Sequence, residues 1–513
     1  MRAANFAVRA LAVVWGAAFL AWAALHVFIV PRIGDYRELL QQQASRAVGM
    51  RVQIGSIRAQ GGWLVPAFEI NEVQLLDAQG REALRLPRVL AAISPRSVLR
   101  GQFEQLVIDQ PELDIHRDSQ GHVWVAGLNT GVAGDGSAAD WFFAQPEFVV
   151  RQGMVHWRDE SRHGVNGPTL SLTQVDVVMR NQWRHHHLRV DVTPPSDFGQ
   201  RLSLLGKFQQ TPWQRSGDVQ HWTGELFTDM PHVDLSSLRQ WLTLDSGVSL
   251  QEGRGAVRAW TDIVQGQPVG VTADVALDAV DVNLGADLKP LNLRHIRGRL
   301  GGHWQDDEVE VSSQDLMFET QDGEQWPGGV LRVNWRGSNF NSGAVTADRL
   351  DLEALAQISQ RLPLPDAFRT SLARWQPKGQ VNQFKANWLL SHASNGELQP
   401  QYTAHGSVKQ LHWLHDAAAT NALGHVPGVQ GADVEFDLTE HSGKTHVHIQ
   451  KGSLTLPLGL DDPHLVLDEP TAQVILAFCI AMVLPGEVGW QIKFARSPGD
   501  PNTTANAHQP VIL

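Results

Sequence analysis

The sequence predicts a mainly β protein: an elongated, curled antiparallel β-groove of repeated modules with short helices, preceded by one transmembrane helix. Three observations predict this fold class. Residues 10–30 form one unbroken apolar stretch. From residue 51 onward, apolar and polar residues alternate with the period of two that is typical of strands. Turn-forming residues separate the alternating segments, as at residues 77–80 and 118–121.

The apolar stretch 10–30 is long enough to cross a bilayer, because a helix of this length rises ~31 Å, about the thickness of the hydrocarbon core. Arg2 and Arg9 precede it, and cytoplasmic flanks carry excess positive charge, so we expect a single-pass protein with its N-terminus in the cytoplasm. A cleaved signal peptide is the alternative, because residues 21–23 have the small-x-small form of a cleavage site. The apolar run continues past them, which favours an uncleaved anchor over residues 1–31.

Residues 32–126 are predicted to form an N-terminal β portion that begins with a short amphipathic helix. Asp35 and Glu38 lie three residues apart before Leu39 and Leu40, which is a capping-box-like start, and Gly49 offers a left-handed stop. The Gly-, Ser- and Asp-rich stretch 127–140 is predicted to be a linker or a long surface loop.

Residues 141–470 are predicted to form the main β body. Two parts of it, about 233–320 and 350–460, contain the same short phrases in the same order, each after a helix that Asp234 or Asp351 caps. The matched strand phrases are 271–273 with 402–404, 296–298 with 429–431, and Leu316 with Leu454. We therefore expect one repeated module, a short capped helix followed by several antiparallel strands.

The alternation stops near Pro470, so residues 471–513 are predicted to be an atypical C-terminal tail. Its apolar segment 474–484 is too short to span a membrane, and residues 497–513 show no periodicity.

Composition excludes some classes of partner. The net charge of −12 and the lack of a basic cluster argue against nucleic acid. The chain has one cysteine, Cys479, so no intramolecular disulfide can form, which suits a large bacterial periplasmic protein that folds without disulfides.

No motif predicts covalent chemistry, a metal or a cofactor, so we expect a protein that is not an enzyme. The phosphate-loop-like residues 442–445 lack the first glycine, where Leu438 stands, and their context is a hairpin turn. His185–His187 cannot converge on one ion from a strand, whereas His446 and His448 share a face without further ligands. Most of the eighteen tryptophans are explained by core packing, and the remainder are candidates for an apolar surface.

A long antiparallel sheet buries one face by packing on helices, by pairing with a second sheet, or by curling around an apolar guest. Predicted helices are too few to cover so many strands, so we expect a groove whose apolar inner face holds acyl chains while headgroups stay in water. The candidate lining residues are Val52, Ile54, Phe68, Ile70, Leu113, Ile115, Val175, Val177, Val280, Val282, Leu284, Val309 and Val311.

The succession of features resembles the AsmA-like superfamily of Gram-negative envelope proteins, and most closely its YhdP family. The resemblance covers residue 1 to about residue 470 and is carried by the phrases at 36–40, 49–57, 66–70, 84–89, 97–99 and 115–118. Members of that family are longer, so the resemblance implies an N-terminal portion with a divergent or truncated C-terminus.

The resemblance implies anchoring in the bacterial inner membrane and a periplasmic groove that carries phospholipid toward the outer membrane, which would maintain outer-membrane lipid homeostasis and the permeability barrier. Phospholipid is then the main partner, with other envelope proteins as further candidates. The alternative is an envelope scaffold or assembly factor whose sheet edges bind partner proteins by strand addition.

Overall fold

The computed structural model describes most of the chain from residue 30 onward. The described residues are 30–48, 51–60, 66–76, 82–94, 102–125, 128–129, 137–164, 167–239, 248–337, 341–392, 398–413, 428–439, 443–455, 464–467, 472–477, 491–496 and the single residues 13, 15, 16, 23, 27, 97, 100 and 241. The predicted membrane span, residues 10–30, lies almost wholly outside them. Among the helices that are described, none combines the length and the apolarity needed to cross a membrane.

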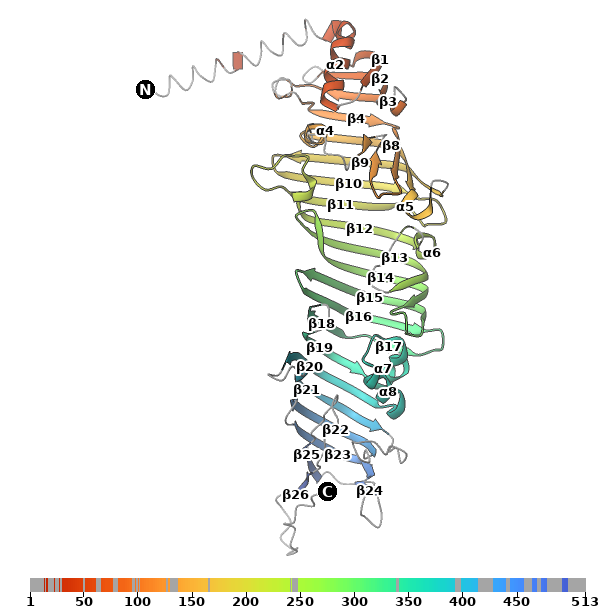
Figure 1. Ribbon diagram of the computed structural model, residues 1–513, viewed down its shortest axis with the longest axis vertical. Helices are drawn as coiled ribbons and strands as arrows, with labels where there is room; N and C mark the ends of the chain where they lie inside the picture. The colour runs from red at the N-terminus through yellow and green to blue at the C-terminus, as the bar shows by residue number, and fades with distance from the viewer. Residues whose placement is uncertain are drawn as a thin grey trace, which may run out of the picture. The chain divides into compact units, whose positions relative to one another are not determined.

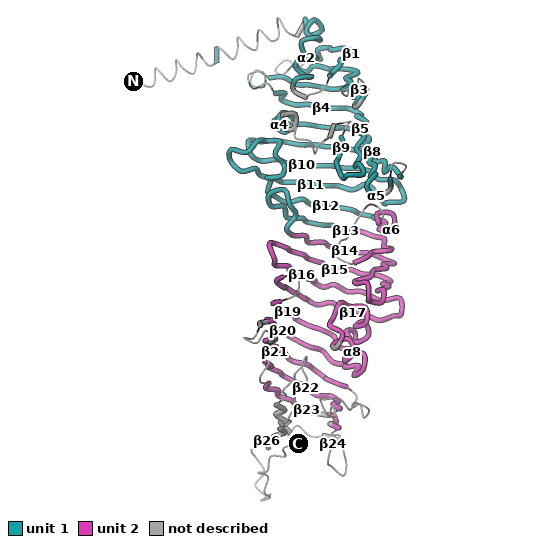
Figure 2. The backbone as a smooth tube through the Cα atoms, viewed as in Figure 1, with its two compact units in different colours: residues 1–233, 258–269 teal, residues 234–257, 270–513 magenta. Residues whose placement is uncertain are grey.

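Strands dominate the described chain, which confirms the prediction of a mainly β, largely antiparallel protein (Figure 1). The chain divides into two compact units (Figure 2). Unit 1 comprises residues 1–233 and 258–269, and unit 2 comprises residues 234–257 and 270–513. The predicted linker 127–140 lies inside unit 1.

Unit 1 begins with two helical segments and continues mainly as strands. Its elements are η2 (Val30–Tyr36), α2 (Arg37–Val48), β1 (Arg51–Gln60), β2 (Ala67–Leu76), β3 (Glu82–Ala92), β4 (Gln105–Asp109), β5 (Glu112–Arg117), β6 (Val123–Val125), β7 (Leu128–Asn129), α4 (Ser137–Phe143), β8 (Glu147–Asp159), α5 (Glu160–His163), β9 (Thr169–Gln182), β10 (His185–Thr193), β11 (Leu202–Gln209), η3 (Val219–His221) and β12 (Thr223–Asp234). Strands β13 (Ser249–Val264) and β14 (Gln267–Asn283) have residues in both units.

Unit 2 has the same character. Its remaining elements are α6 (Leu235–Leu238), β15 (Leu291–Gln305), β16 (Glu308–Thr320), β17 (Gln325–Pro327), β18 (Val330–Arg336), β19 (Ser342–Asp351), α7 (Leu352–Ile358), η4 (Ser359–Arg361), α8 (Asp366–Trp375), β20 (Lys378–His392), β21 (Leu398–Trp413), β22 (Gly428–Thr439), β23 (Gly443–Thr455), β24 (His464–Leu467), β25 (Ala472–Ala477) and β26 (Gln491–Arg496). The predicted tail thus contains β25 and β26, which pair with each other.

One strand departs from the antiparallel pattern that the sequence predicts. Strand β8 runs parallel to β4 and to β5, which lie end to end along it, with Leu106 opposite Phe148 and Leu113 opposite Val155. Parallel neighbours require a crossover connection of a dozen or more residues. Here that connection contains β6, β7 and α4, so part of the stretch predicted to be a linker or loop serves the sheet of unit 1.

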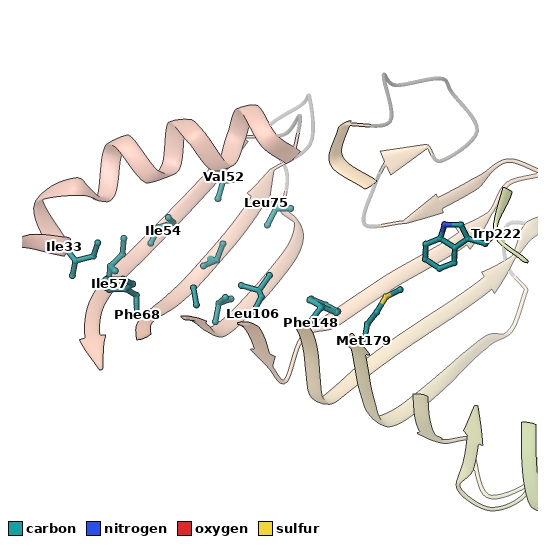
Figure 3. Close-up of a cluster of buried hydrophobic side chains, with 13 residues drawn as sticks. Ile33, Val52, Ile54, Ile57, Phe68, Leu75, Leu106, Phe148, Met179 and Trp222 are labelled. Carbon is teal, nitrogen blue, oxygen red and sulfur yellow. The ribbon is translucent and has the colours of Figure 1, made fainter. Parts of the chain in front are cut away.

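The helix predicted after the anchor is α2, and it lies across β1 to β3 (Figure 3). Beneath it lies the largest buried cluster of unit 1, which includes Ile33, Val52, Ile54 and Phe68. Aromatic side chains of α4 extend this cluster, because the Phe142 ring lies 4.2 Å from that of Phe148 on β8.

One stripe of α2 also covers the free edge of β1. Gln41 Oε1 accepts a hydrogen bond from the Ile54 backbone N–H and Ser45 Oγ accepts one from Val52, each at 2.9 Å, while Arg37 donates to the Gly55 carbonyl. Residues 37, 41 and 45 are spaced four apart, so they share one face of the helix. These side chains occupy backbone groups that would otherwise pair with another strand.

The two similar stretches, about 233–320 and 350–460, contain corresponding elements. Each begins with a helix capped by aspartate: Asp234 accepts the Ser236 N–H before α6, and Asp351 accepts the Ala354 N–H before α7. The matched strand phrases fall on β14 and β21, on β15 and β22, and on β16 and β23.

Candidate functional site

The strand register of unit 1 aligns apolar side chains in two continuous rows across the strands, which together we call the apolar face of unit 1. The first row is Ile57, Ile70, Val89, Ile108, Val150, Val177, Val190 and Leu204, on β1 to β4 and β8 to β11. The second is Phe68, Ala91, Leu106, Phe148, Met179, Leu188, Gly206 and Leu226, on β2 to β4 and β8 to β12.

Only part of this face is covered by helices. Beneath α2 and α4 the rows are mostly buried, as Phe68 and Leu106 show, and there they form an ordinary protein core. Farther along, Val177, Val190 and Leu204 are half-buried although their rows continue without a polar interruption. The first row is therefore only partly covered from β9 to β11, whereas Met179 of the second row still belongs to the buried cluster and Leu188 packs against it.

A buried polar cluster lies at the same end of these strands as the turn between β9 and β10. His186 is 1% exposed; its Nδ1 lies 2.7 Å from Asn181 Oδ1 and its Nε2 lies 3.1 Å from Gln210 Oε1. Its ring stacks on that of Trp222 at 4.0 Å, and Trp222 packs on Phe143 of α4. Burial lowers the pKa of His186, so its imidazole stays neutral near pH 7.

Unit 2 carries rows of the same kind, which we call the apolar face of unit 2. One row is Val271, Gly302, Val311, Val333, Val345, Ala386, Ala404 and Leu438, on β14 to β16 and β18 to β22. The row beside it is largely aromatic: Trp304, Val309, Trp335, Gly343, Trp388 and Tyr402.

Gly343 shows why the aromatic row requires a residue without a side chain. A Cβ at this position would lie 2.2 Å from Cζ2 of Trp388, so any other residue would displace the indole from its place across β19. Trp304, on the same row, is 40% exposed. Part of the tryptophan content thus lines an apolar surface, as the sequence suggested for the tryptophans outside the core.

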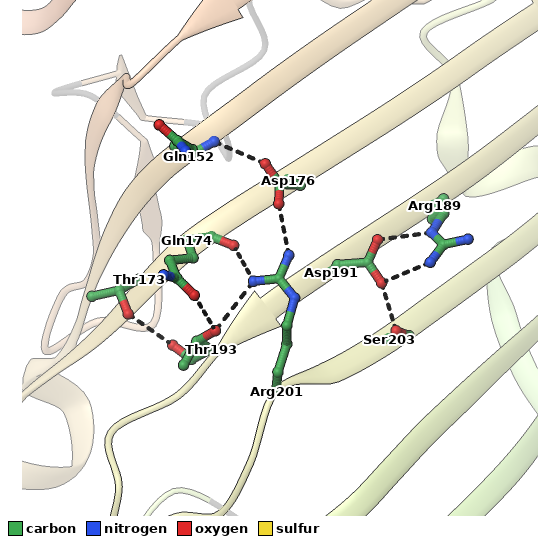
Figure 4. A network of polar contacts seen from close by, with 9 residues as sticks. All are labelled: Gln152, Thr173, Gln174, Asp176, Arg189, Asp191, Thr193, Arg201 and Ser203. Atoms are coloured by element: carbon green, nitrogen blue, oxygen red, sulfur yellow. Dashed lines mark hydrogen bonds and ion pairs between the residues drawn. The ribbon is translucent and has the colours of Figure 1, made fainter.

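The opposite face of each unit carries ion pairs, some within a strand and some between strands. In unit 1, Arg201, which directly precedes β11, pairs with Asp176 of β9 at 2.6 Å. Arg189 pairs with Asp191 of the same strand, β10, at 2.7 Å (Figure 4). In unit 2, Arg299 pairs with Asp274 at 2.6 Å. The Arg189 guanidinium lowers the pKa of the Asp191 carboxyl, and Ser203 adds a hydrogen bond to it. A few apolar residues of unit 1, Val107 and Val149 among them, are also buried on this side.

The predicted lining residues differ in how far they are buried. Those beneath or beside the covered core are Val52, Ile54, Phe68 and Ile70. Val175 and Val280 are buried as well, and Leu113, Ile115, Val177, Val282 and Val309 are half-buried. Val311 is 45% exposed on the apolar face of unit 2, and Leu284 follows the last residue of β14.

The histidine motifs and the described part of the phosphate-loop-like motif lie on strands β10 and β23. His185 and His187 are exposed on β10 on either side of the buried His186, and His446 and His448 are exposed on one face of β23. Gly443 to Thr445 belong to β23, which pairs with β22 as a hairpin. A pocket of about 660 Å³ is lined by polar residues that include Glu104, Glu147 and Arg180 together with Ala67 and Ala92, and none of its lining residues belongs to the apolar rows.

Sequence reasoning missed several residues of the uncovered rows, above all Val190 and Leu204. Leu188, Val190 and Val192 alternate with polar residues, as expected for a strand with one apolar face. The three histidines at the start of this strand are instead typical of a metal site, which masked the pattern. The missed signal was the alternation itself, read over the whole of β10 and β11.

Comparison with known proteins was made for the whole chain. A search of curated proteins gave no match. A family model described as the YhdP protein matches residues 1–477, which is most of the chain. This chain therefore belongs to the YhdP family.

Proposed function

We propose that this protein is anchored in the bacterial inner membrane and that its apolar faces hold the acyl chains of phospholipids as these move through the periplasm between the inner and outer membranes. In this role it would maintain outer-membrane lipid homeostasis and the permeability barrier. Membership of the YhdP family and the large β-sheet support the proposal. The observation that carries it is the first apolar row, which continues without a polar interruption from β9 to β11 with side chains that are only half-buried.

The rows suit an acyl chain for a physical reason. Each methylene group that leaves water for an apolar surface contributes about 0.8 kcal/mol. Because the rows continue from strand to strand at a spacing of about 4.8 Å, a chain that moves along them exchanges one set of apolar contacts for an equivalent set. Movement is then passive, its direction is set by a lipid gradient or a partner, and no covalent chemistry or cofactor takes part.

The covered core sets where a lipid enters. Helices α2 and α4 occupy the apolar face over β1 to β4, so an acyl chain cannot contact these rows without displacing the helices. Entry is therefore lateral, onto the half-buried first row from β9 onward, and not along the row from β1.

Two substitutions on neighbouring residues of β11 test the proposal. Leu204 belongs to the first apolar row. Leu205 lies on the other face of the sheet, in register with Arg189 of β10 and Phe227 of β12. A charge on an apolar path costs several kcal/mol, and only ~1.4 kcal/mol of added barrier slows movement about tenfold. We therefore expect Leu204→Arg to slow phospholipid delivery to the outer membrane at least about tenfold, measured by pulse-labelling cells that carry the variant as their sole copy.

Leu205→Arg is the matched control and should leave the delivery rate unchanged. Equal rates for the two variants, with both proteins present at normal levels, would contradict transport along the apolar face. If Leu204→Arg instead left lipid delivery normal but removed cross-links to partner proteins, the scaffold alternative would be favoured. That alternative already meets an obstacle at β1, because α2 covers the edge of this strand.

A further inference from the structure

Two tryptophans of unit 1 are exposed far more than any packing role requires. The Trp183 side chain is 87% exposed and the Trp213 side chain is fully exposed. Trp183 lies in the turn between β9 and β10, and Trp213 lies in the connection between β11 and β12, which projects from the sheet in Figure 1. Large aromatic side chains in water bring no stability to the fold, so their position calls for another explanation.

The two connections lie at the same end of the strands, and a backbone hydrogen bond joins them. The Gln210 N–H donates to the Arg184 carbonyl at 3.0 Å, and the turn between β13 and β14 joins them because the Gly266 N–H donates to the Trp222 carbonyl at 2.8 Å. Val219 and Val264, 44% and 45% exposed, lie in the same set of connections. The three connections therefore form one platform with exposed apolar side chains, which we call the tip platform.

The backbone at both tryptophans is strained. Their φ angles are +57° for Trp183 and +74° for Trp213, in the left-handed region where glycine and asparagine are favoured and a bulky residue is a genuine outlier. An outlier of this kind at an exposed turn points to a function for the side chain and not to folding.

Charge indicates which partner fits. The Arg184 guanidinium lies over the Trp183 ring, 5.4 Å from its centroid, so a cation stands beside the exposed indole. Asp140 holds the second connection in place, since it pairs with Arg215 at 2.8 Å and accepts the Gly217 N–H. Tryptophan and arginine together are the side chains of the membrane–water interface, where indoles lie at headgroup level and guanidinium groups meet phosphates.

We propose that the tip platform docks on the surface of a phospholipid bilayer, with Trp183 and Trp213 inserted at headgroup depth and Arg184 at lipid phosphate. The inference rests on the exposed tryptophans and not on the proposed function. The platform does, however, lie on the strands where the first apolar row is only half-buried, so docking would bring a bilayer beside the site of lateral entry.

The experiment places a fluorescent probe beside each tryptophan. The full chain, with Cys479→Ser to remove the native thiol, carries an environment-sensitive label at Gln182→Cys or Gln214→Cys and is incorporated into vesicles of phosphatidylethanolamine and phosphatidylglycerol. Nitroxide on the lipid headgroups should quench both labels. A label at Gln120→Cys, in the exposed turn after β5 at the other end of the strands, should not be quenched.

The tryptophans themselves are tested by Trp183→Ala with Trp213→Ala, which should abolish the quenching, and the arginine is tested by Arg184→Gln, which should weaken it. Quenching at residues 182 and 214 no greater than at residue 120, or quenching that persists without the tryptophans, would overturn the proposal. So would protection from aqueous iodide without quenching by lipid nitroxide, because that result indicates a protein or glycan occupant. Lipid delivery is measured separately, so its failure leaves this result intact.

Discussion

At the scale of the residue, left-handed backbone positions recur inside strands, and carboxylates hold them. The N–H of Gln152, whose φ is +52°, donates to Asp176 at 2.9 Å, and Asp176 also pairs with Arg201 (Figure 4). In unit 2 the N–H of Gln410, with φ +51°, donates to Asp433, which also pairs with Lys409. Such bulges bend a strand locally without interrupting its apolar row.

Asp118 gives a prediction at this scale. It closes the turn after β5: its carboxylate accepts the indole N–H of Trp124 at 3.0 Å and the backbone N–H groups of Gln120 and His122 at 2.9 Å. The Trp124 hydrogen bond, with the two backbone bonds, lowers the pKa of Asp118 to about 2. The stability that these bonds contribute is present above the ordinary pKa of 3.8 and is lost as the pH falls toward about 2.

We expect the ¹³C shift of the Asp118 carboxyl to titrate near pH 2 in the native protein, and Trp124→Phe to raise that midpoint toward the ordinary value. A midpoint that Trp124→Phe leaves unchanged would contradict the assigned hydrogen bond.

At the scale of the element, α2 performs two tasks that its amphipathic pattern alone does not reveal. Its apolar side covers the cluster around Val52 and Phe68, and the stripe of Arg37, Gln41 and Ser45 occupies the edge of β1. An uncovered edge strand is a template for association with other chains. The helix therefore ends the sheet of unit 1 at β1.

Removing the edge contacts should loosen β1. Gln41→Ala and Ser45→Ala each remove one hydrogen bond to β1 worth about 1 kcal/mol, so the amides of Ile54 and Val52 should exchange with solvent roughly fivefold faster. Hydrogen exchange read by NMR or mass spectrometry measures this. Gln42→Ala, at an exposed position of α2, should leave both amides unchanged, and equal behaviour of all three variants would count against the edge cap.

Much of the architecture could be predicted from the sequence, and the limits have a physical cause. The capped helices at Asp234 and Asp351 and the alternation of β14 follow from local chemistry, and both appear. The parallel position of β8 could not be predicted, because it depends on which distant strand β8 meets. Likewise, Phe68 and Leu204 each lie in an alternating strand, so periodicity places both on the apolar face. It does not indicate that α2 and α4 cover Phe68 and not Leu204.

At the scale of the whole molecule, each unit presents a polar face with interstrand ion pairs and an apolar face with continuous rows. Exposed ion pairs contribute little to stability, typically 0 to about 1 kcal/mol each. What distinguishes the faces is solvent preference: one remains in water, and the other, where no helix covers it, lowers its free energy by contact with an apolar guest. The proposed transport of phospholipid uses this difference alone.

The most direct measurement is photo-crosslinking in cells with the probe at neighbouring residues of opposite faces. Benzoylphenylalanine at Val190 or Leu204 in unit 1, or at Val333 in unit 2, should form adducts with phospholipid, identified by mass spectrometry. The same probe at Leu205 or Asn334, one residue away and on the polar face, should form none. Equal phospholipid labelling at both sets of positions, or none at either, would contradict the claim that the apolar faces carry lipid.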